Sequence, residues 1–188
     1  SRRYPQLELD ITLTDRVVDI VEEGYDLVIR ISRSGSVNHA ARKLASSHNI
    51  LCAAPAYLQQ FGTPQTPADL RDHQCITYLY SGDEWHFTDS AGKAHQVKVR
   101  GKIHTNNGDT SRAMALAGAG IIWQPSFLIG PDLTSGALVP LLPGYKLPDI
   151  DVLAMYPSRR HLSVKVRVLI DYLVEVFAGA PPWDKTAP

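Results

Sequence analysis

The 188-residue sequence contains only two cysteines, Cys52 and Cys75, and they form no C-x-x-C pair. Each lies in an apolar stretch typical of a buried, reduced thiol, so we expect neither a disulfide nor a thiolate metal site. The seven histidines are scattered, without an H-E-x-x-H motif or an accompanying carboxylate cluster. We therefore expect no bound metal and no cofactor.

The sequence also lacks net charge, because 19 basic side chains balance 19 acidic ones. A module that binds DNA by neutralising phosphates normally carries a basic excess, so DNA contact is not expected to be the main task of this segment. Long apolar runs, a basic-then-apolar leader and Asn-x-Ser/Thr sites are missing as well. These absences favour a soluble, cytoplasmic protein without membrane contact.

Motifs that specify an enzyme are missing too. The sequence has no G-x-S-x-G nucleophile elbow, no P-loop and no G-x-G-x-x-G. Gly118-Ala119-Gly120 follows a predicted helix instead of opening one, so it is not a dinucleotide fingerprint. We expect a protein that is not an enzyme.

The first 31 residues predict a β-α-β unit. Residues 7–13 alternate apolar and polar side chains, which indicates a half-buried strand. Thr14 and Asp15 follow as the cap and first-turn acid of a helix that ends at Gly24. A second, more apolar strand covers residues 25–31, and such a unit implies a parallel sheet.

The remaining chain predicts a β-rich centre followed by further helices. Residues 32–47 are polar and give no clear assignment. Helices are expected to begin at Pro55, at Pro67 after the capping residue Thr66, and at Asn107, and a last, deeply packed helix is expected over 163–177. Strands are expected at 50–53, 76–80, 84–88, 97–103, 121–125, 137–141 and 151–156, with turns at 89–93 and 130–136 and a breaker-rich linker at 143–148.

This order of elements predicts two lobes. Lobe I would comprise residues 1–51 and 148–179, lobe II residues 52–147, and residues 180–188 a flexible tail. A lobe built from two separated stretches needs two crossover strands, and residues 50–54 and 146–151 are the candidates. Paired crossovers leave a cleft, and clefts between lobes are preferred ligand sites.

Several runs together resemble the effector-binding domain of LysR-type transcription regulators, and most of all the branch that includes the regulator CrgA. The resemblance covers about residues 4–177, and it depends on the order and spacing of its motifs. These motifs are Tyr4-Pro5-Gln6-Leu7-Glu8-Leu9-Asp10-Ile11, Leu27-Val28-Ile29-Arg30-Ile31, Leu51-Cys52-Ala53-Ala54-Pro55-Ala56-Tyr57-Leu58, Thr66-Pro67-Ala68-Asp69-Leu70-Arg71-Asp72-His73, and Asn106-Asn107-Gly108 leading to Ala115-Leu116-Ala117-Gly118-Ala119-Gly120-Ile121.

The resemblance implies an α/β, two-lobe fold like the type 2 periplasmic binding proteins, with an interlobe cleft for a small effector such as an organic acid or an aromatic compound. It also implies a dimeric or tetrameric regulator that contacts DNA only through an N-terminal winged helix. The sequence departs from the family pattern at its start, where we expect the winged helix, the first strand and most of the first helix to be absent. A free-standing solute-binding protein, or an enzyme on the same scaffold, are the alternative functions.

Nine residues are candidate ligand contacts, each with a structural alternative. Thr14 and Asp15 would open a helix at the carboxyl end of a strand, where free N–H groups attract anions; the alternative is ordinary capping. The same two possibilities hold for Asn106, Asn107, Gly108 and Asp109, which the resemblance places beside the cleft.

The other three candidates lie at strand ends. Arg30 ends a buried strand, where a charge must be paired; it would meet an anionic effector or, as the alternative, Asp26 or Asp15. Ser32 is a weaker candidate of the same kind, and its neighbour Arg33, outside these nine, is another. Trp123 would form a wall of the cleft or pack in the core.

Overall fold

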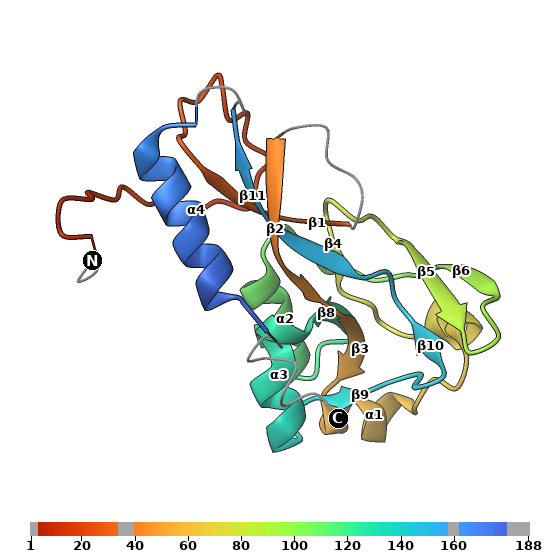
Figure 1. Ribbon diagram of the computed structural model, residues 1–188. Helices are drawn as coiled ribbons and strands as arrows, with labels where there is room; N and C mark the ends of the chain where they lie inside the picture. The colour runs from red at the N-terminus through yellow and green to blue at the C-terminus, as the bar shows by residue number, and fades with distance from the viewer. Residues whose placement is uncertain (1–3, 34–39, 158–161, 180–188) are drawn as a thin grey trace.

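The computed structural model describes residues 4–33, 40–157 and 162–179 and shows a mixed α/β protein (Figure 1). One part, called here the first lobe, is a three-stranded antiparallel sheet in the order β1-β11-β2 together with α4 and the N-terminal segment 4–27. The bounds are β1 Val28–Arg33, β2 Ala40–Ser47, β11 Ile150–Tyr156 and α4 Val164–Val176.

The central strand β11 forms the core of the first lobe because it is buried on both faces. Val152 and Ala154 pack toward Ile170 of α4, while Leu153 and Met155 pack with Ile20 on the opposite face. Successive side chains of a strand point to opposite faces, so one apolar run serves both layers.

The second lobe contains the chain from β3 to β10 and has three small sheets. In one, β3 lies between β8 and β9; in another, β5 lies between β10 and β6; the third is the parallel pair β4 and β7. The bounds are β3 Asn49–Ala53, α1 Pro55–Phe61, η1 Pro67–Asp72, β4 Thr77–Tyr78, β5 Glu84–Asp89, β6 Ala94–Lys98, β7 His104–Thr105, α2 Gly108–Leu116, β8 Ile122–Pro125, α3 Ser126–Ser135, β9 Val139–Pro140 and β10 Tyr145–Lys146.

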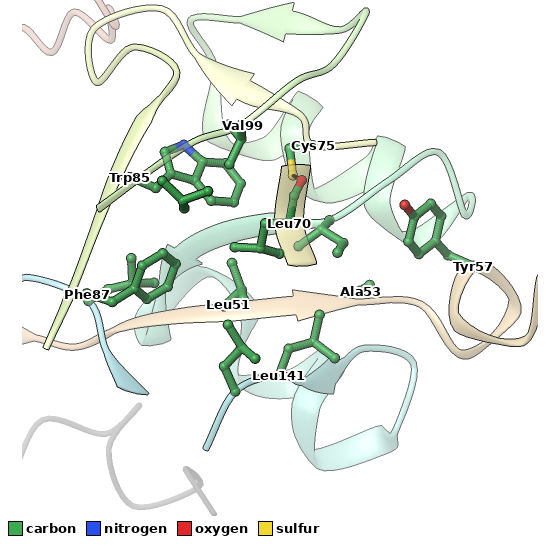
Figure 2. Packing of buried hydrophobic residues seen from close by; sticks show 13 residues of the cluster. Leu51, Ala53, Tyr57, Leu70, Cys75, Trp85, Phe87, Val99 and Leu141 are labelled. Atoms are coloured by element: carbon green, nitrogen blue, oxygen red, sulfur yellow. Dashed lines mark hydrogen bonds between the residues drawn. The ribbon is translucent and has the colours of Figure 1, made fainter. Parts of the chain in front are cut away.

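The core of the second lobe gathers around β3. Leu51 contributes to a buried cluster with Leu70 of η1 and with Trp85 and Phe87 of β5 (Figure 2). Trp85 and Phe87 alternate with exposed residues along β5, so this strand turns one face to the core and the other to solvent.

Two connections join the lobes and lie side by side. One passes from β2 to β3 through His48, and the other leads from β10 into β11 through Asp149. His48 Nδ1 lies 2.8 Å from Asp149 Oδ1, and Asn49 Nδ2 donates to the Pro148 carbonyl at 2.7 Å. The two strands that cross between the lobes are therefore hydrogen-bonded to one another. The exact residues at which one predicted lobe ends and the other begins stay a prediction.

Much of the predicted secondary structure is confirmed. Asn107 caps α2 by accepting a hydrogen bond from the Thr110 amide at 2.8 Å, and Ser163 caps α4 in the same way. The predicted strands at 50–53, 84–88, 121–125 and 151–156 correspond to β3, β5, β8 and β11, and the turn at 89–93 joins β5 to β6.

The predicted β-α-β unit at the N-terminus is wrong. Residues 7–13 form no strand, and Leu9, Ile11 and Leu13 are 48%, 74% and 91% exposed. The segment after Thr14 forms turns instead of a helix. Alternation determines which side chains would share a face, but a strand also needs a neighbour to pair with, and no described strand lies beside residues 7–13.

The expected parallel sheet is wrong for the same part of the chain, because β1 and β2 both pair with β11 antiparallel. β2 was not predicted, because it lies in the stretch 32–47 that had no clear assignment. Residues 34–39 of that stretch lie outside the described residues, and so does the predicted tail at 180–188. β2 is stabilised by pairing with the apolar β11, and its own residues have little propensity to form a strand.

The expected turn at 130–136 is a helix, α3, with Pro131 inside it. Gly130 and Pro131 disfavour a helix locally. Burial of Ile129, Gly130 and Asp132 against the second lobe overrides that preference. A linker was expected at 143–148, and its middle instead forms β10, which pairs with β5.

The start of η1 gives a prediction about pH. The Oδ2 atom of Asp69 accepts hydrogen bonds from the amides of Gln65 and Thr66, both at 2.9 Å, and these bonds lower the pKa of Asp69. A carboxyl group with a lowered pKa stabilises the fold above its unfolded pKa, and this contribution is lost as the pH falls through the folded value. We expect Asp69→Asn to lower the melting temperature at about pH 6 and the difference to shrink as the pH falls from about 4 through the lowered pKa of Asp69. A difference that stayed constant across this range would contradict the assignment.

Candidate ligand-binding site

A pocket lies where the two connections cross between the lobes, and we call it the hinge pocket. Its enclosed space is small, about 40 Å³, and it opens to solvent. Its lining residues come from both lobes and from both connections: Arg33, Asn49, Ser81, Glu84, Trp85, His86, Trp123, Leu147, Pro148 and Ile150.

Two side chains of the hinge pocket carry buried polar atoms without a hydrogen-bond partner. These atoms are Nε1 of Trp85 and Oδ1 of Asn49. Trp85 is only 2% exposed, and Figure 2 shows its nitrogen on the ring edge turned away from Phe87 and Leu51. Buried polar groups in proteins are almost always paired, so each of these two atoms is an exception within a residue that lines the hinge pocket.

The rim of the hinge pocket carries opposite charges. Glu84 and His86 are exposed and flank Trp85 on the solvent face of β5. Arg33 ends β1 on the side of the first lobe. One cation and one anion at the rim leave no strong preference for a ligand of either charge.

Two of the residues singled out from the sequence meet between the lobes. Asn107 Nδ2 donates to Asp15 Oδ2 at 2.7 Å, which joins the N-terminal segment to the start of α2. Asn107 uses its Oδ1 at the same time to cap the helix. The two candidates are brought together, and each already makes polar contacts within the protein.

Thr14 lies in an exposed turn, where its hydroxyl accepts a bond from the Arg16 amide at 3.3 Å. The helix N-terminus that made Thr14 a candidate is not formed. Arg30 and Ser32 lie in β1, and they precede Arg33 of the pocket by three residues and by one residue. The predicted alternative, an ion pair of Arg30 with Asp26 or Asp15, is not formed among the described residues. Asp26 pairs instead with Lys165 at 2.6 Å.

The remaining candidates lie around α2 and β8. Asn106 is exposed, Gly108 begins α2, and Asp109 is in its first turn. A Cβ on Gly108 would lie 3.0 Å from the Leu128 side chain, so this glycine permits close packing of α2 on α3. Trp123, on β8, lines the hinge pocket and also packs against the core cluster. Ligand contact by these residues stays a prediction.

Sequence reasoning missed Trp85 and Asn49. Trp85 was read only as part of a strand, although an indole carries a donor that needs a partner when buried. Asn49 lies next to the predicted crossover at 50–54, where a polar residue beside a buried strand was the available signal. Neither residue belongs to a recognisable motif. The hinge pocket forms only when distant segments of the chain meet, so no local pattern marks its lining residues.

Features of a metal site and of a membrane span are both missing from the described residues. Among residues 4–33, 40–157 and 162–179, no three His, Cys, Asp or Glu side chains gather as a metal site would require. In the same part of the chain, no helix combines the length and apolar character needed to span a bilayer.

Both cysteines are buried, as predicted, and this gives a chemical test. Burial raises the pKa of Cys52 and of Cys75 to about 12, so both thiols are protonated at neutral pH. We expect neither to react with a thiol reagent such as DTNB in the folded protein at pH 8, and both to react in urea. Rapid labelling of the folded protein would contradict this burial.

Comparison with known proteins gives a consistent result. Residues 1–178 match the family described as "LysR substrate binding domain". The regulator DmlR of Escherichia coli K12 is 37% identical over 185 residues, covering 97% of this chain and 60% of DmlR. The activator TtdR of the same organism is 34% identical over 175 residues, covering 92% and 56% of the two chains. The chain thus spans less than two thirds of the length of these relatives.

Solved structures agree with the sequence comparison. The regulatory domain of CrgA, a LysR-type regulator from Neisseria meningitidis, has a TM-score of 0.79 and 28% identity, with 94% of this chain and 87% of that one covered. The regulatory domain of the C227S variant of AphB from Vibrio vulnificus also has a TM-score of 0.79 and 28% identity, with 93% and 87% covered.

Proposed function

Because this chain belongs to the LysR substrate-binding domain family, we propose that it senses a small organic effector, which binds in the hinge pocket. Its fold is the two-lobe, type 2 periplasmic-binding-protein-like fold of LysR-type regulatory domains. The chain is thus the effector-binding domain of a LysR-type transcription regulator.

The observation that carries this proposal is the composition of the hinge pocket. Arg33 comes from the first lobe, Trp85 and Trp123 come from the second, and Asn49 is the first residue of β3, directly after the connection through His48. A molecule that contacts all of these groups binds one lobe arrangement better than another. The difference between the two affinities is the free energy available for signalling.

The partners of the whole regulator belong to the same proposal. DNA would be contacted by a winged helix outside these 188 residues, since the present chain has no basic excess. The domains would associate as homodimers or tetramers and pass the lobe arrangement to the DNA-binding segments. The protein would act in the cytoplasm, without catalysing a reaction.

A thermal-shift screen of organic acids and aromatic metabolites tests the proposal. A ligand at a concentration 100-fold above its Kd stabilises the folded state by about 2.7 kcal/mol, which raises the Tm of a domain this size by roughly 5–10 °C. We expect Trp123→Ala, which removes a pocket wall, to abolish most of the shift. Leu79→Ala, at an exposed site outside the pocket lining, should preserve it.

Stabilising compounds that act equally on the wild type and on Trp123→Ala would contradict ligand binding in the hinge pocket. A screen in which no compound raises the Tm would count against effector sensing by this domain.

A further inference from the structure

A hydrogen bond joins the two lobes outside the connections that carry the chain between them. Asn107 Nδ2, at the start of α2 in the second lobe, donates to Asp15 Oδ2 of the first lobe at 2.7 Å. We call this hydrogen bond the clasp. Neither of its residues lines the hinge pocket, so the lobes are tied together at a second place.

The first lobe holds Asp15 in position through the residues that follow it. Arg16 Nη1 donates to Glu23 Oε1 at 2.8 Å, and Arg16 Nη2 donates to the other oxygen of the same carboxylate. Between these two residues, the buried Ile20 packs against β11, the central strand of the lobe. The turn segment that carries Asp15 is therefore closed on itself and anchored in the first lobe.

The second lobe fixes the orientation of the Asn107 side chain. Asn107 Oδ1 accepts from the amide and the hydroxyl of Thr110 at 2.8 and 3.0 Å, while the Asn107 amide donates to Thr105 Oγ1 at 3.1 Å. These bonds leave Nδ2 as the group that meets Asp15. The carboxylate of Asp15 thus lies beside the first turn of α2, where the helix dipole favours a negative charge. Both ends of the clasp are positioned by their own lobes.

The turn that follows β4 runs from the neighbourhood of the clasp to the hinge pocket. Burial, and then the nearby charge of Asp15, raise the pKa of Tyr78 at the end of β4. The hydroxyl of Ser81 donates to the Tyr78 carbonyl at 3.2 Å, and Ser81 lines the hinge pocket. A molecule in the hinge pocket therefore borders a turn whose other end lies near the clasp.

We propose that the clasp holds the ligand-free domain in one lobe arrangement, so that Asp15 and Asn107 set the balance on which an effector acts. Lobes that are joined by two crossing connections can rotate about them, and such a rotation separates Asp15 from Asn107 while both cores stay intact. A hydrogen bond to an ionised carboxylate is stronger than one between neutral groups, so its loss shifts the populations of the two arrangements. Only the response to an effector rests on the proposed sensing function.

Distance measurements between spin labels on the two lobes test the proposal on the ligand-free protein. Arg167→Cys in α4 and Gln60→Cys in α1 place one label on each lobe, since both positions are exposed. The native cysteines are buried and stay unlabelled. Pulsed electron spin resonance on this doubly labelled parent protein is expected to give one main distance.

Asn107→Asp breaks the clasp and keeps the helix cap. The new carboxylate still accepts from the Thr110 amide, but it cannot donate to Asp15 and repels it. We expect the population of a second distance to rise about fivefold or more relative to the parent. Asp15→Ala removes the acceptor and is expected to act in the same direction.

An exchange of the two side chains restores the clasp. In the double variant Asp15→Asn/Asn107→Asp, the amide donates from position 15 to the carboxylate at position 107. The population of the second distance should return to within about twofold of the parent value. Asn106→Asp adds the same charge at the neighbouring exposed position and should leave the distances unchanged.

Unchanged distances in both Asn107→Asp and Asp15→Ala would overturn the inference, and so would a double variant that behaves like Asn107→Asp. Equal effects of Asn106→Asp and Asn107→Asp would show that added charge near α2, and not the clasp, changes the lobe arrangement. If Asn107→Asp does not fold, Asp15→Ala at an exposed position still tests the clasp. The thermal-shift screen decides separately whether the domain binds an effector.

Discussion

Leu51→Ala is expected to lower the free energy of unfolding by about 2–5 kcal/mol. Leu51 is 3% exposed and lies in β3, between β8 and β9. Its side chain packs in the cluster that holds Leu70 and Trp85, so truncation removes apolar contacts and leaves a cavity. The loss is a large part of the roughly 5–15 kcal/mol that stabilises a typical domain. Urea unfolding followed by circular dichroism measures it.

A matched leucine in the same lobe provides the control. Leu79 is 62% exposed, and we expect Leu79→Ala to change the free energy of unfolding by no more than about 0.5 kcal/mol. Equal effects of the two substitutions would mean that β3 does not run through the core of the second lobe.

Asp132→Asn is the second substitution with a large expected effect, about 1.5–3 kcal/mol of lost stability. Asp132 is 7% exposed on α3, and its Oδ1 accepts from Arg112 Nη2 of α2 at 2.7 Å. The hydrogen bonds that Arg112 donates to Asp132, together with the negative charge of Asp132, raise the pKa of Arg112. Removing the negative charge leaves a partly buried guanidinium without its counterion. Breaking such a pair destabilises the protein by more than the intact pair stabilises it.

An exposed ion pair provides the control for the contribution of burial to the loss of stability expected for Asp132→Asn. Asp83 Oδ2 lies 3.5 Å from Lys98 Nζ, with half of the Asp83 side chain exposed. We expect Asp83→Asn to cost at most about 0.5 kcal/mol, because solvent screens such pairs. If chemical denaturation gave the same loss for both aspartates, the pairing of α2 with α3 through Asp132 would not be a source of stability.

The sequence predicted well those elements whose signals are local. The cap at Asn107, the capping box at Thr66 and the cap at Ser163 each fix a helix start through bonds to neighbouring amides. The strand at 151–156 was predictable because all of its residues after Asp151 are apolar or aromatic. These elements include β11 and α2, which border the region between the lobes.

Elements that depend on a distant partner were not predictable. The alternation of residues 7–13 indicates a strand, but nothing local shows whether a neighbour is present to pair with it. Conversely, the polar β2 forms because β11 pairs with it, and α3 forms across Pro131 because its apolar face is buried. Local propensity is a weak guide wherever tertiary contacts decide the outcome.

The difference between local signals and distant contacts also explains which residues of the candidate site could be predicted. Trp123, which lines the hinge pocket, was singled out because an aromatic residue shortly before a proline at a strand end is conspicuous in the sequence. Trp85 and Asn49 were missed because their significance depends on unpartnered atoms in one pocket, which only the folded chain brings into view. A cleft between lobes was predictable from the order of the elements, whereas its chemistry was not.

A crystal structure of the domain with a compound that raises its Tm tests the central claim most directly. We predict electron density for the compound in the hinge pocket, in contact with Asn49 and Trp85 and bordered by Trp123. Density for the compound at any site that touches only one lobe would contradict the claim that this domain senses its effector where the two connections cross.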